Sequence, residues 1–359
     1  MRWSYTIGRF AGTEVKVHVT FFLLLAWLAY YVYQQAGAQA AVNYTIFLLL
    51  FFFCIVLHEF GHITMASRFG VRTPDVILLP IGGVARLERI PEEPRQELLI
   101  ALAGPAVTLG IIVLLYLATL VLGLPVMVAD PLAEDSSLLV QLLVSNALVL
   151  VFNLIPAFPL DGGRVLRAAL ARRMGLVRAT RVAGSIGQLF AVGLGIVGIM
   201  LPAPLMILVA FFIFLGAGSE ANAVATRVAG RGLRVAQMMV TDFRTVPVHA
   251  TLSQAVDLLL SGEQREFPVV DNLGRTEGLL TRENLIRGLS RLGTEATVAE
   301  AMTPAAPSVS PTLGFQEALD RLRSSGLPAL PVVDAGGSLV GMLTMDNITD
   351  LLLVRRARG

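Results

Sequence analysis

Long apolar runs separated by short polar segments make up the first two thirds of the chain. A helix needs about 20 mostly apolar residues to cross a bilayer, and most of these runs approach or exceed that length. We therefore predict a polytopic α-helical membrane unit with six transmembrane helices. The predicted spans are residues 20–33 with their flanks, 43–67, 98–121, 138–155, 182–201 and 204–218.

Other patterns surround these spans. Residues 1–17 alternate polar and apolar positions, which predicts a short β-ribbon at the membrane surface. Residues 76–90 have strand character around Gly82 and Gly83, which predicts a membrane-associated β-hairpin that turns at the two glycines. The prolines and glycines of residues 157–163 oppose a regular helix, and a basic helix is expected to follow at residues 164–174.

After Arg234 the composition changes and the sequence repeats itself. Residues 267–271 (FPVVD) recur as residues 330–334 (LPVVD), and residues 278–281 (GLLT) recur as residues 341–344 (GMLT). Such a repeat predicts two small α/β units that pack as a pseudo-symmetric pair. We assign residues 1–222 to the membrane domain, 223–236 to a linker, 237–294 to the first repeat and 295–355 to the second.

Composition supports the membrane interpretation. Of the 359 residues, 55% are hydrophobic and 15% are charged, whereas a soluble protein carries about 25% charged residues. The lipid bilayer is therefore an expected partner. A net charge of +2 does not indicate nucleic acid as a partner.

The arginines predict the orientation in the cell membrane. Arginines lie before the first predicted span and after the second, fourth and sixth spans. The loops between them, at residues 34–41, 130–135 and 201–204, contain neither lysine nor arginine. Because basic residues accumulate on the cytoplasmic side, we expect a multi-pass protein whose N-terminus and C-terminal repeats are cytoplasmic.

The second predicted span carries the sequence HEFGH, residues 58–62, near its end. His58 and His62 are four residues apart, so they lie on one face of a helix and can bind one metal ion. Glu59 can then take a proton from a metal-bound water. Ionisable groups are costly inside a bilayer, and they indicate a functional site by default. The topology above places this site near the cytoplasmic side.

A catalytic zinc site has three protein ligands and keeps a fourth position for water. Asp161 is the favoured third ligand, because it follows the fourth span at the same predicted depth as the histidines. His18 and Cys54 stay open as alternatives, whereas His249 lies in the repeats. Asp161 has a simpler interpretation as well, as a cap of the helix that follows it.

Together these segments resemble the site-2 protease family of intramembrane zinc metalloproteases. The second motif of that family, NxxPxxxxDG, matches Asn153, Pro156, Asp161 and Gly162 position by position. The resemblance implies that Asp161 completes a zinc site and that Asn153 acts in catalysis.

The same resemblance implies the activity. His58 and His62 would be zinc ligands, and Glu59 would be the general base of a metalloendopeptidase. The expected substrates are membrane proteins with a transmembrane helix, cleaved within or near that helix in regulated intramembrane proteolysis. The β-hairpin would help to present an extended substrate.

The C-terminal repeats resemble a pair of cystathionine β-synthase (CBS) domains, as in one subgroup of these proteases. The resemblance implies a regulatory module that binds an adenine nucleotide and associates into homodimers. Asparagine stands where an aspartate is expected in both GxxTxxD segments, so the hydroxyl-binding group is neutral here. The candidate nucleotide contacts are Thr281, Asn284, Thr344, Asp346 and Asn347.

A CBS-regulated transporter or channel is the alternative function. A transport path would need polar residues along several spans. The polar residues of this chain cluster at one predicted depth instead, which favours the protease.

Overall fold

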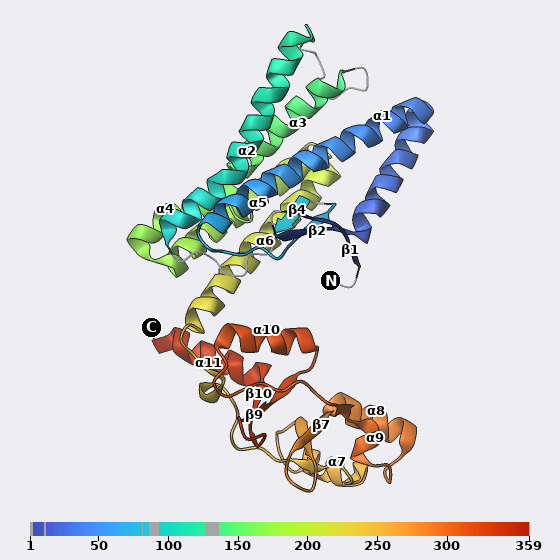
Figure 1. The fold of residues 1–359 in the computed structure, drawn as a ribbon, viewed down its shortest axis with the longest axis vertical. Helices are drawn as coiled ribbons and strands as arrows, with labels where there is room; N and C mark the ends of the chain where they lie inside the picture. The colour runs from blue at the N-terminus through green and yellow to red at the C-terminus, as the bar shows by residue number, and fades with distance from the viewer. Residues whose placement is uncertain (1–2, 11, 81, 86–92, 126–135, 359) are drawn as a thin grey trace. The chain divides into compact units, whose positions relative to one another are not determined.

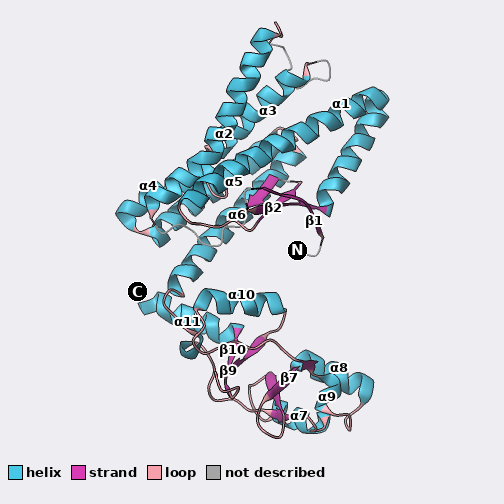
Figure 2. Ribbon diagram, in the orientation of Figure 1, coloured by secondary structure: helices cyan, strands magenta, loops and turns pink. Residues whose placement is uncertain are grey.

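The computed structural model describes residues 3–10, 12–80, 82–85, 93–125 and 136–358. The chain divides into two units, Met1–Val224 and Ala225–Gly359. Helices dominate the first unit, whereas the second combines short strands with helices (Figure 2). The acidic loop at residues 130–135 and the expected extension of the hairpin through residues 86–90 lie outside the described residues.

The first long helix, α1 (Val19–Arg68), consists of two arms that meet at Gly37. Gly37 has a φ of +86°, a left-handed conformation that glycine adopts at little cost, and the chain folds back there (Figure 1). The two arms pack through Phe21 and Phe52, whose ring centroids lie 4.7 Å apart. The break lies within residues 34–41, the expected connection between the first two apolar runs.

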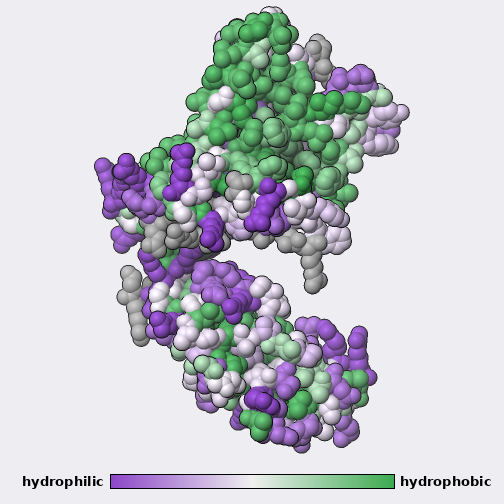
Figure 3. Space-filling view, in the orientation of Figure 1, coloured by the Kyte–Doolittle hydropathy of each residue, from purple (hydrophilic) through white to green (hydrophobic). Residues whose placement is uncertain are grey.

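Further helices complete the first unit, and Figure 3 shows mostly apolar side chains over them. Within the described residues, α1 and three later helices are long and apolar enough to cross a membrane. Helix α3 is shorter, with 16 residues, and α4 is the expected basic helix. The helices after α1 are α2 (Pro94–Val121), α3 (Leu138–Asn153), α4 (Asp161–Met174), α5 (Leu176–Met200) and α6 (Pro204–Ala229).

Four strands of the first unit form one mixed sheet in the order β1-β2-β3-β4. The antiparallel pair β1 (Ser4–Phe10) and β2 (Thr13–His18) confirms the expected N-terminal ribbon. The antiparallel pair β3 (Asp75–Leu79) and β4 (Gly82–Ala85) confirms a second hairpin. A parallel pairing of β2 with β3 joins the two hairpins, which the sequence did not predict.

The position of the hairpin turn is a correction. Gly82 and Gly83 pair with Leu79 and Leu78, so both glycines lie inside β4 and not at the turn. The prediction that the hairpin turns at these glycines is therefore wrong. A glycine pair is a common turn signal, but it also suits a strand that another side chain approaches closely.

The second unit contains the two predicted repeats in related order. A short 3-10 helix, η1 (Val235–Gln237), precedes them. The first repeat consists of β5 (Val246–Pro247), α7 (Leu252–Leu260), β6 (Glu266–Val270), β7 (Thr276–Thr281) and α8 (Arg282–Leu292). The second consists of α9 (Val298–Ala301), β8 (Thr303–Pro304), α10 (Phe315–Ser325), β9 (Ala329–Val333), β10 (Leu339–Thr344) and α11 (Met345–Arg358).

Each repeat extends the sheet of the other. Strand β8 of the second repeat pairs with β7 of the first, and Val240 of the first repeat bridges Met342 in β10 of the second. Leu279 of β7 also shares a buried cluster with Ala329 and Met342. Because each repeat contributes a segment that pairs with a strand of the other, the two repeats form one folded pair, as the internal repeat predicts.

We predict that Leu280→Ala destabilises the second unit by about 2–5 kcal/mol, the usual cost of truncating a fully buried leucine. Leu280 is completely buried in the core of the first repeat. Calorimetric unfolding of the full chain in detergent measures the change. Leu260→Ala is the matched control, because Leu260 is 79% exposed. Equal melting temperatures for the two variants would contradict the prediction.

Candidate metal centre

Three ligand atoms converge between α1 and α4. Nε2 of His58 lies 3.1 Å from Nε2 of His62 and 3.1 Å from Oδ2 of Asp161. Nε2 of His62 lies 3.2 Å from the same carboxylate oxygen. Both imidazoles are buried, with 4% and 5% of their surface exposed. The structure therefore brings together the three residues that the sequence indicates as metal ligands.

The other ring nitrogens determine the tautomers. Nδ1 of His62 lies 2.7 Å from the carbonyl oxygen of Ile100, which only accepts, so Nδ1 donates the proton. Nδ1 of His58 lies 2.8 Å from the hydroxyl oxygen of Thr108, which itself donates to the carbonyl oxygen of Gly104. When the rings are neutral, both Nε2 atoms therefore present lone pairs, as metal-binding histidines do.

These donor atoms fit a zinc ion. Two imidazole lone pairs and a carboxylate that face one another repel unless a metal cation or a shared proton lies between them. Bonds of about 2.0–2.1 Å to a tetrahedral zinc ion place neighbouring ligand atoms about 3.3 Å apart. The separations of 3.1–3.2 Å are close to that value. A fourth tetrahedral position would stay open for water or substrate.

Asp161 reaches the histidines because α4 begins at this residue. The helix was expected to begin at residue 164, after an irregular segment that included Asp161, and that expectation is wrong. The N-cap position belongs to Leu160, so Asp161 does not cap the helix. A Cβ atom at Gly162 would lie 2.2 Å from the carbonyl oxygen of Ile155. Glycine thus lets the preceding loop fold back on the first turn of α4.

Close contact between α1 and α2 also depends on glycine. A Cβ atom at Gly104 would lie 2.2 Å from Nε2 of His62, and one at Gly61 would lie 2.6 Å from the carbonyl oxygen of Ala103. The sequence does not show that Gly104 faces the histidines. Gly104 is therefore a residue of the site that sequence reasoning missed.

Comparison with known proteins identifies both units. The model of peptidase family M50 matches residues 46–141 and 121–194, which include all three converging residues. The chain belongs to this family. The CBS domain model matches residues 235–291 and 298–354, so this member of family M50 also carries a CBS pair. Both resemblances seen in the sequence are confirmed.

Relatives of this M50 member match along nearly its whole length. Zinc metalloprotease MJ0392 of Methanocaldococcus jannaschii is 29% identical over 348 residues, which cover 97% of this chain and 96% of that protein. Putative zinc metalloprotease Rip3 of Mycobacterium tuberculosis is 29% identical over 381 residues, which cover 99% and 94%. The solved site-2 protease from Methanocaldococcus jannaschii is 32% identical, with 61% and 95% coverage and a TM-score of 0.47.

Glu59 of this M50 member lies against the edge of the sheet. A Cβ atom at Gly83 would be 2.6 Å from Cγ and 3.3 Å from Oε1 of Glu59. Gly83 belongs to β4, the last strand in the sheet order. The absence of a side chain at Gly83 therefore lets an edge strand approach the predicted general base. No sequence signal connected Gly83 with Glu59.

Three further residues of the membrane unit are candidates from the sequence, namely Asn153, His18 and Cys54. Asn153 is the last residue of α3 and is partly buried, and its catalytic role stays a prediction. His18 is the N-cap of α1, where its Nδ1 lies 2.8 Å from the Thr20 hydroxyl oxygen. Cys54 is partly buried. Within the described residues, neither His18 nor Cys54 belongs to the group of converging ligand atoms.

Four of the predicted nucleotide contacts serve the fold of the CBS pair. The Thr281 and Thr344 hydroxyl oxygens accept from the backbone N–H of Asn284 and Asn347, each at 3.1 Å. The Asn284 amide donates to the hydroxyl oxygen of Thr303 at 2.9 Å, and the Asn347 amide donates to a backbone carbonyl at 2.6 Å. The threonine bonds cap α8 and α11, and the two amide bonds tie each repeat to the N-terminal segment of the other.

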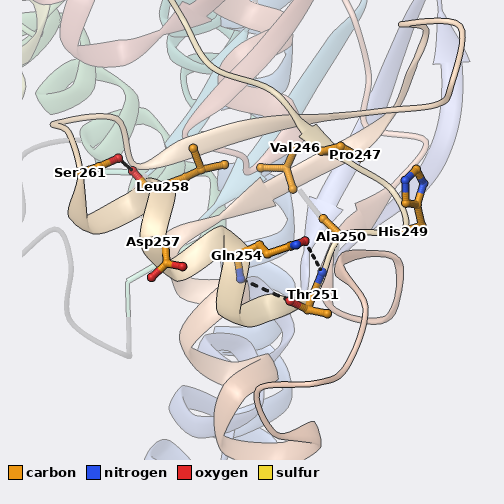
Figure 4. A pocket seen from close by; sticks show the side chains of 9 residues that line it. All are labelled: Val246, Pro247, His249, Ala250, Thr251, Gln254, Asp257, Leu258 and Ser261. Atoms are coloured by element: carbon orange, nitrogen blue, oxygen red, sulfur yellow. Dashed lines mark hydrogen bonds between the residues drawn. The ribbon is translucent and has the colours of Figure 1, made fainter.

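Asp346, the fifth predicted contact, is exposed at the start of α11. Partial burial of the Glu266 carboxyl, in the other repeat, raises its pKa, and the charge of Asp346 raises that pKa further. A pocket of about 790 Å³ lies in the first repeat, lined by side chains between residues 246 and 261 (Figure 4). None of the five predicted contacts lines this pocket, so nucleotide binding stays a prediction.

We predict that Gly104→Ala lowers zinc affinity by at least about tenfold, because a methyl group there would displace an imidazole ligand. Metal analysis after dialysis against a chelator of known affinity measures the loss. Gly110→Ala is the matched control on the same helix, since its Cβ atom would meet nothing within 4 Å. Full zinc retention by folded Gly104→Ala would contradict the prediction.

We also predict that Gly83→Ala lowers turnover about tenfold or more while zinc content stays at one per chain. The added methyl would displace the Glu59 side chain, and a misplaced general base loses part of the 10²–10⁴-fold contribution that such a group makes, by order of magnitude. Peptide cleavage and metal content are measured on the same preparation. Loss of zinc, or unchanged turnover, would show that β4 does not act through Glu59.

Proposed function

We propose that this chain is an intramembrane zinc metalloprotease that hydrolyses peptide bonds within or near transmembrane segments of membrane proteins. The observation that carries the proposal is the convergence of His58, His62 and Asp161 beside Glu59, in a unit of membrane-length apolar helices. Membership of family M50 and the zinc metalloproteases among the relatives support the same activity. The transporter or channel alternative is not favoured, because the family match covers this site.

The chemistry follows from the residues at the site. His58, His62 and Asp161 would hold one zinc ion, which when bound acidifies a water and polarises a carbonyl group. Glu59 would accept a proton from the attacking water and later deliver it to the leaving amine. Asn153, at the end of α3, would hold the backbone of the substrate near the scissile bond.

A transmembrane substrate has to unwind before its peptide bonds are accessible, because helical carbonyl groups are shielded. Among the strands that the structure describes, β4 is an edge of the four-stranded sheet, and Gly83 in this strand lies against Glu59. We expect an unwound segment to pair with β4, since an extended peptide can add to an exposed sheet edge. The paired peptide would then pass beside the general base.

The orientation is part of the proposal. Six spans would be the two arms of α1 with α2, α3, α5 and α6. Arg68 ends the second arm of α1, and Arg172 and Arg173 are exposed at the end of α4. Because positive charge accumulates on the cytoplasmic side, we propose that the metal site, both ends of the chain and the CBS pair face the cytoplasm of a cell membrane.

The CBS pair would modulate the protease. Its fold is a known host of regulatory functions, although fold alone does not determine which one. An adenine nucleotide as the regulatory ligand and a homodimer through the CBS domains are the further proposals for this unit. Titration of the full chain with AMP and ATP, followed by calorimetry, tests the first of these two proposals.

We predict that Glu59→Gln lowers cleavage of a transmembrane substrate about 10²–10⁴-fold, the contribution typical of a general base. The variant should retain zinc, because the three ligands are unchanged. Asp161→Ala should instead lose zinc together with activity. Glu283→Gln is the matched control, because Glu283 is exposed on α8 in the CBS pair. Wild-type cleavage by the Glu59→Gln variant, or ion flux in liposomes without peptide hydrolysis, would overturn the proposal.

A further inference from the structure

Arg167 is a buried charge at the centre of the first unit. It lies on α4, six residues after Asp161, and only 1% of its surface is exposed. Its Nε donates to Oε1 of Glu97 at 2.6 Å, and its Nη1 donates to Oε1 of Glu220 at 2.8 Å. Its Nη2 contacts the same oxygen of Glu97. One guanidinium therefore links α4 to α2 and to α6.

Such a cluster gains little stability over apolar residues of the same shape, because desolvation offsets the attraction between the charges. The guanidinium does, however, supply a rigid planar fork of donors, which specifies geometry more sharply than apolar packing does. A buried Arg–Glu cluster is therefore well suited to hold helices in one relative position.

Glu97 connects Arg167 to the helix that orients the histidines. It lies on α2, three residues before Ile100, whose carbonyl oxygen accepts from Nδ1 of His62. Thr108, which contacts Nδ1 of His58, lies further along the same helix. The ion pair thus joins the helix that carries Asp161 directly to the helix that determines the imidazole orientations.

Arg167 also holds the loop before Asp161. Its guanidinium carbon lies 4.9 Å from the ring centroid of Phe158, within reach of a cation–π interaction. Phe158 is itself buried against Ala183 of α5 and Ala217 of α6. Contacts of Arg167 therefore constrain the chain on both sides of Asp161, in the loop before it and in the helix after it.

We propose that Arg167 is a positioning residue for the third metal ligand. By clamping α4 to α2, it keeps Oδ2 of Asp161 within bonding distance of the point between the two histidines. Glu97 is the main anchor and Glu220 the weaker one, since their side chains are 6% and 28% exposed. The inference rests on the proposed zinc site and adds a residue that touches neither metal nor substrate.

The test measures metal binding by the purified full chain in detergent. Zinc affinity is determined by chelator competition, and Co²⁺ replaces zinc to report ligand geometry through its visible absorption. Arg167→Gln should weaken zinc binding about 10–100-fold, as loss of an outer-shell partner of a metal ligand does, and should change the Co²⁺ spectrum. Arg167→Lys should retain an intermediate affinity, because it keeps the charge but loses the fork. Arg173→Gln, exposed on the last turn of α4, is the matched control.

Two further variants keep the test decisive if Arg167→Gln does not fold. The double variant Arg167→Met, Glu97→Gln removes both charges between α2 and α4, and only the partly exposed Glu220 loses its partner. It should show the same loss of affinity. Glu220→Gln should show a smaller loss, because Arg167 stays paired with Glu97.

The outcomes separate this inference from the proposed function. A wild-type chain that binds neither zinc nor Co²⁺ would overturn the metal site itself. A wild-type chain that binds zinc, together with folded Arg167 variants of unchanged affinity and unchanged Co²⁺ spectrum, would overturn only the positioning role. A purely structural role predicts that second pattern, with a lower melting temperature as the only effect.

Discussion

Electrostatic repulsion among three acceptor atoms is the constraint on which the membrane unit depends. Two imidazole lone pairs and a carboxylate lie within 3.2 Å of one another in a largely buried setting. In a medium of low dielectric constant this arrangement is costly, and a divalent cation between the three atoms reverses the cost. Every element around the site therefore has to hold the ligands together while they repel each other.

Backbone contacts and a buried charge supply that restraint. Gly61 and Gly104 let α1 and α2 approach so closely that a methyl group would strike a ligand or a carbonyl oxygen. Arg167 then ties the helix that carries Asp161 to α2. On the other side of the site, Gly83 lets a strand edge approach the Glu59 side chain. The same close packing that holds the proposed metal ligands thus leaves Glu59, the proposed general base, next to a strand edge.

Local sequence was sufficient for much of this protein. The spacing of His58 and His62 follows from helix periodicity alone, and the break at Gly37 lies where the apolar pattern weakens. The internal repeat predicted a pair of α/β units, because each unit buries its apolar face against the other. The resemblance of these units to known domains predicted that the pair is a CBS pair. Asp161 was found by its residue type and its predicted depth. All of these inferences depend on short-range patterns or on motif spacing, which are visible in the amino-acid sequence without knowledge of the fold.

Contacts between segments far apart in the chain were decided only by the tertiary structure. The sequence assigns Gly83 to a turn, whereas pairing with β3 places it in a strand against Glu59. The sequence places Arg167 in the basic helix expected at residues 164–174, whereas contacts with two distant glutamates make it a buried clamp. The sequence shows that a charged residue or a glycine is present, but the residue that it contacts depends on how the helices and strands pack. The candidate metal ligands could therefore be predicted from the chain alone, whereas the contacts that hold them together could not.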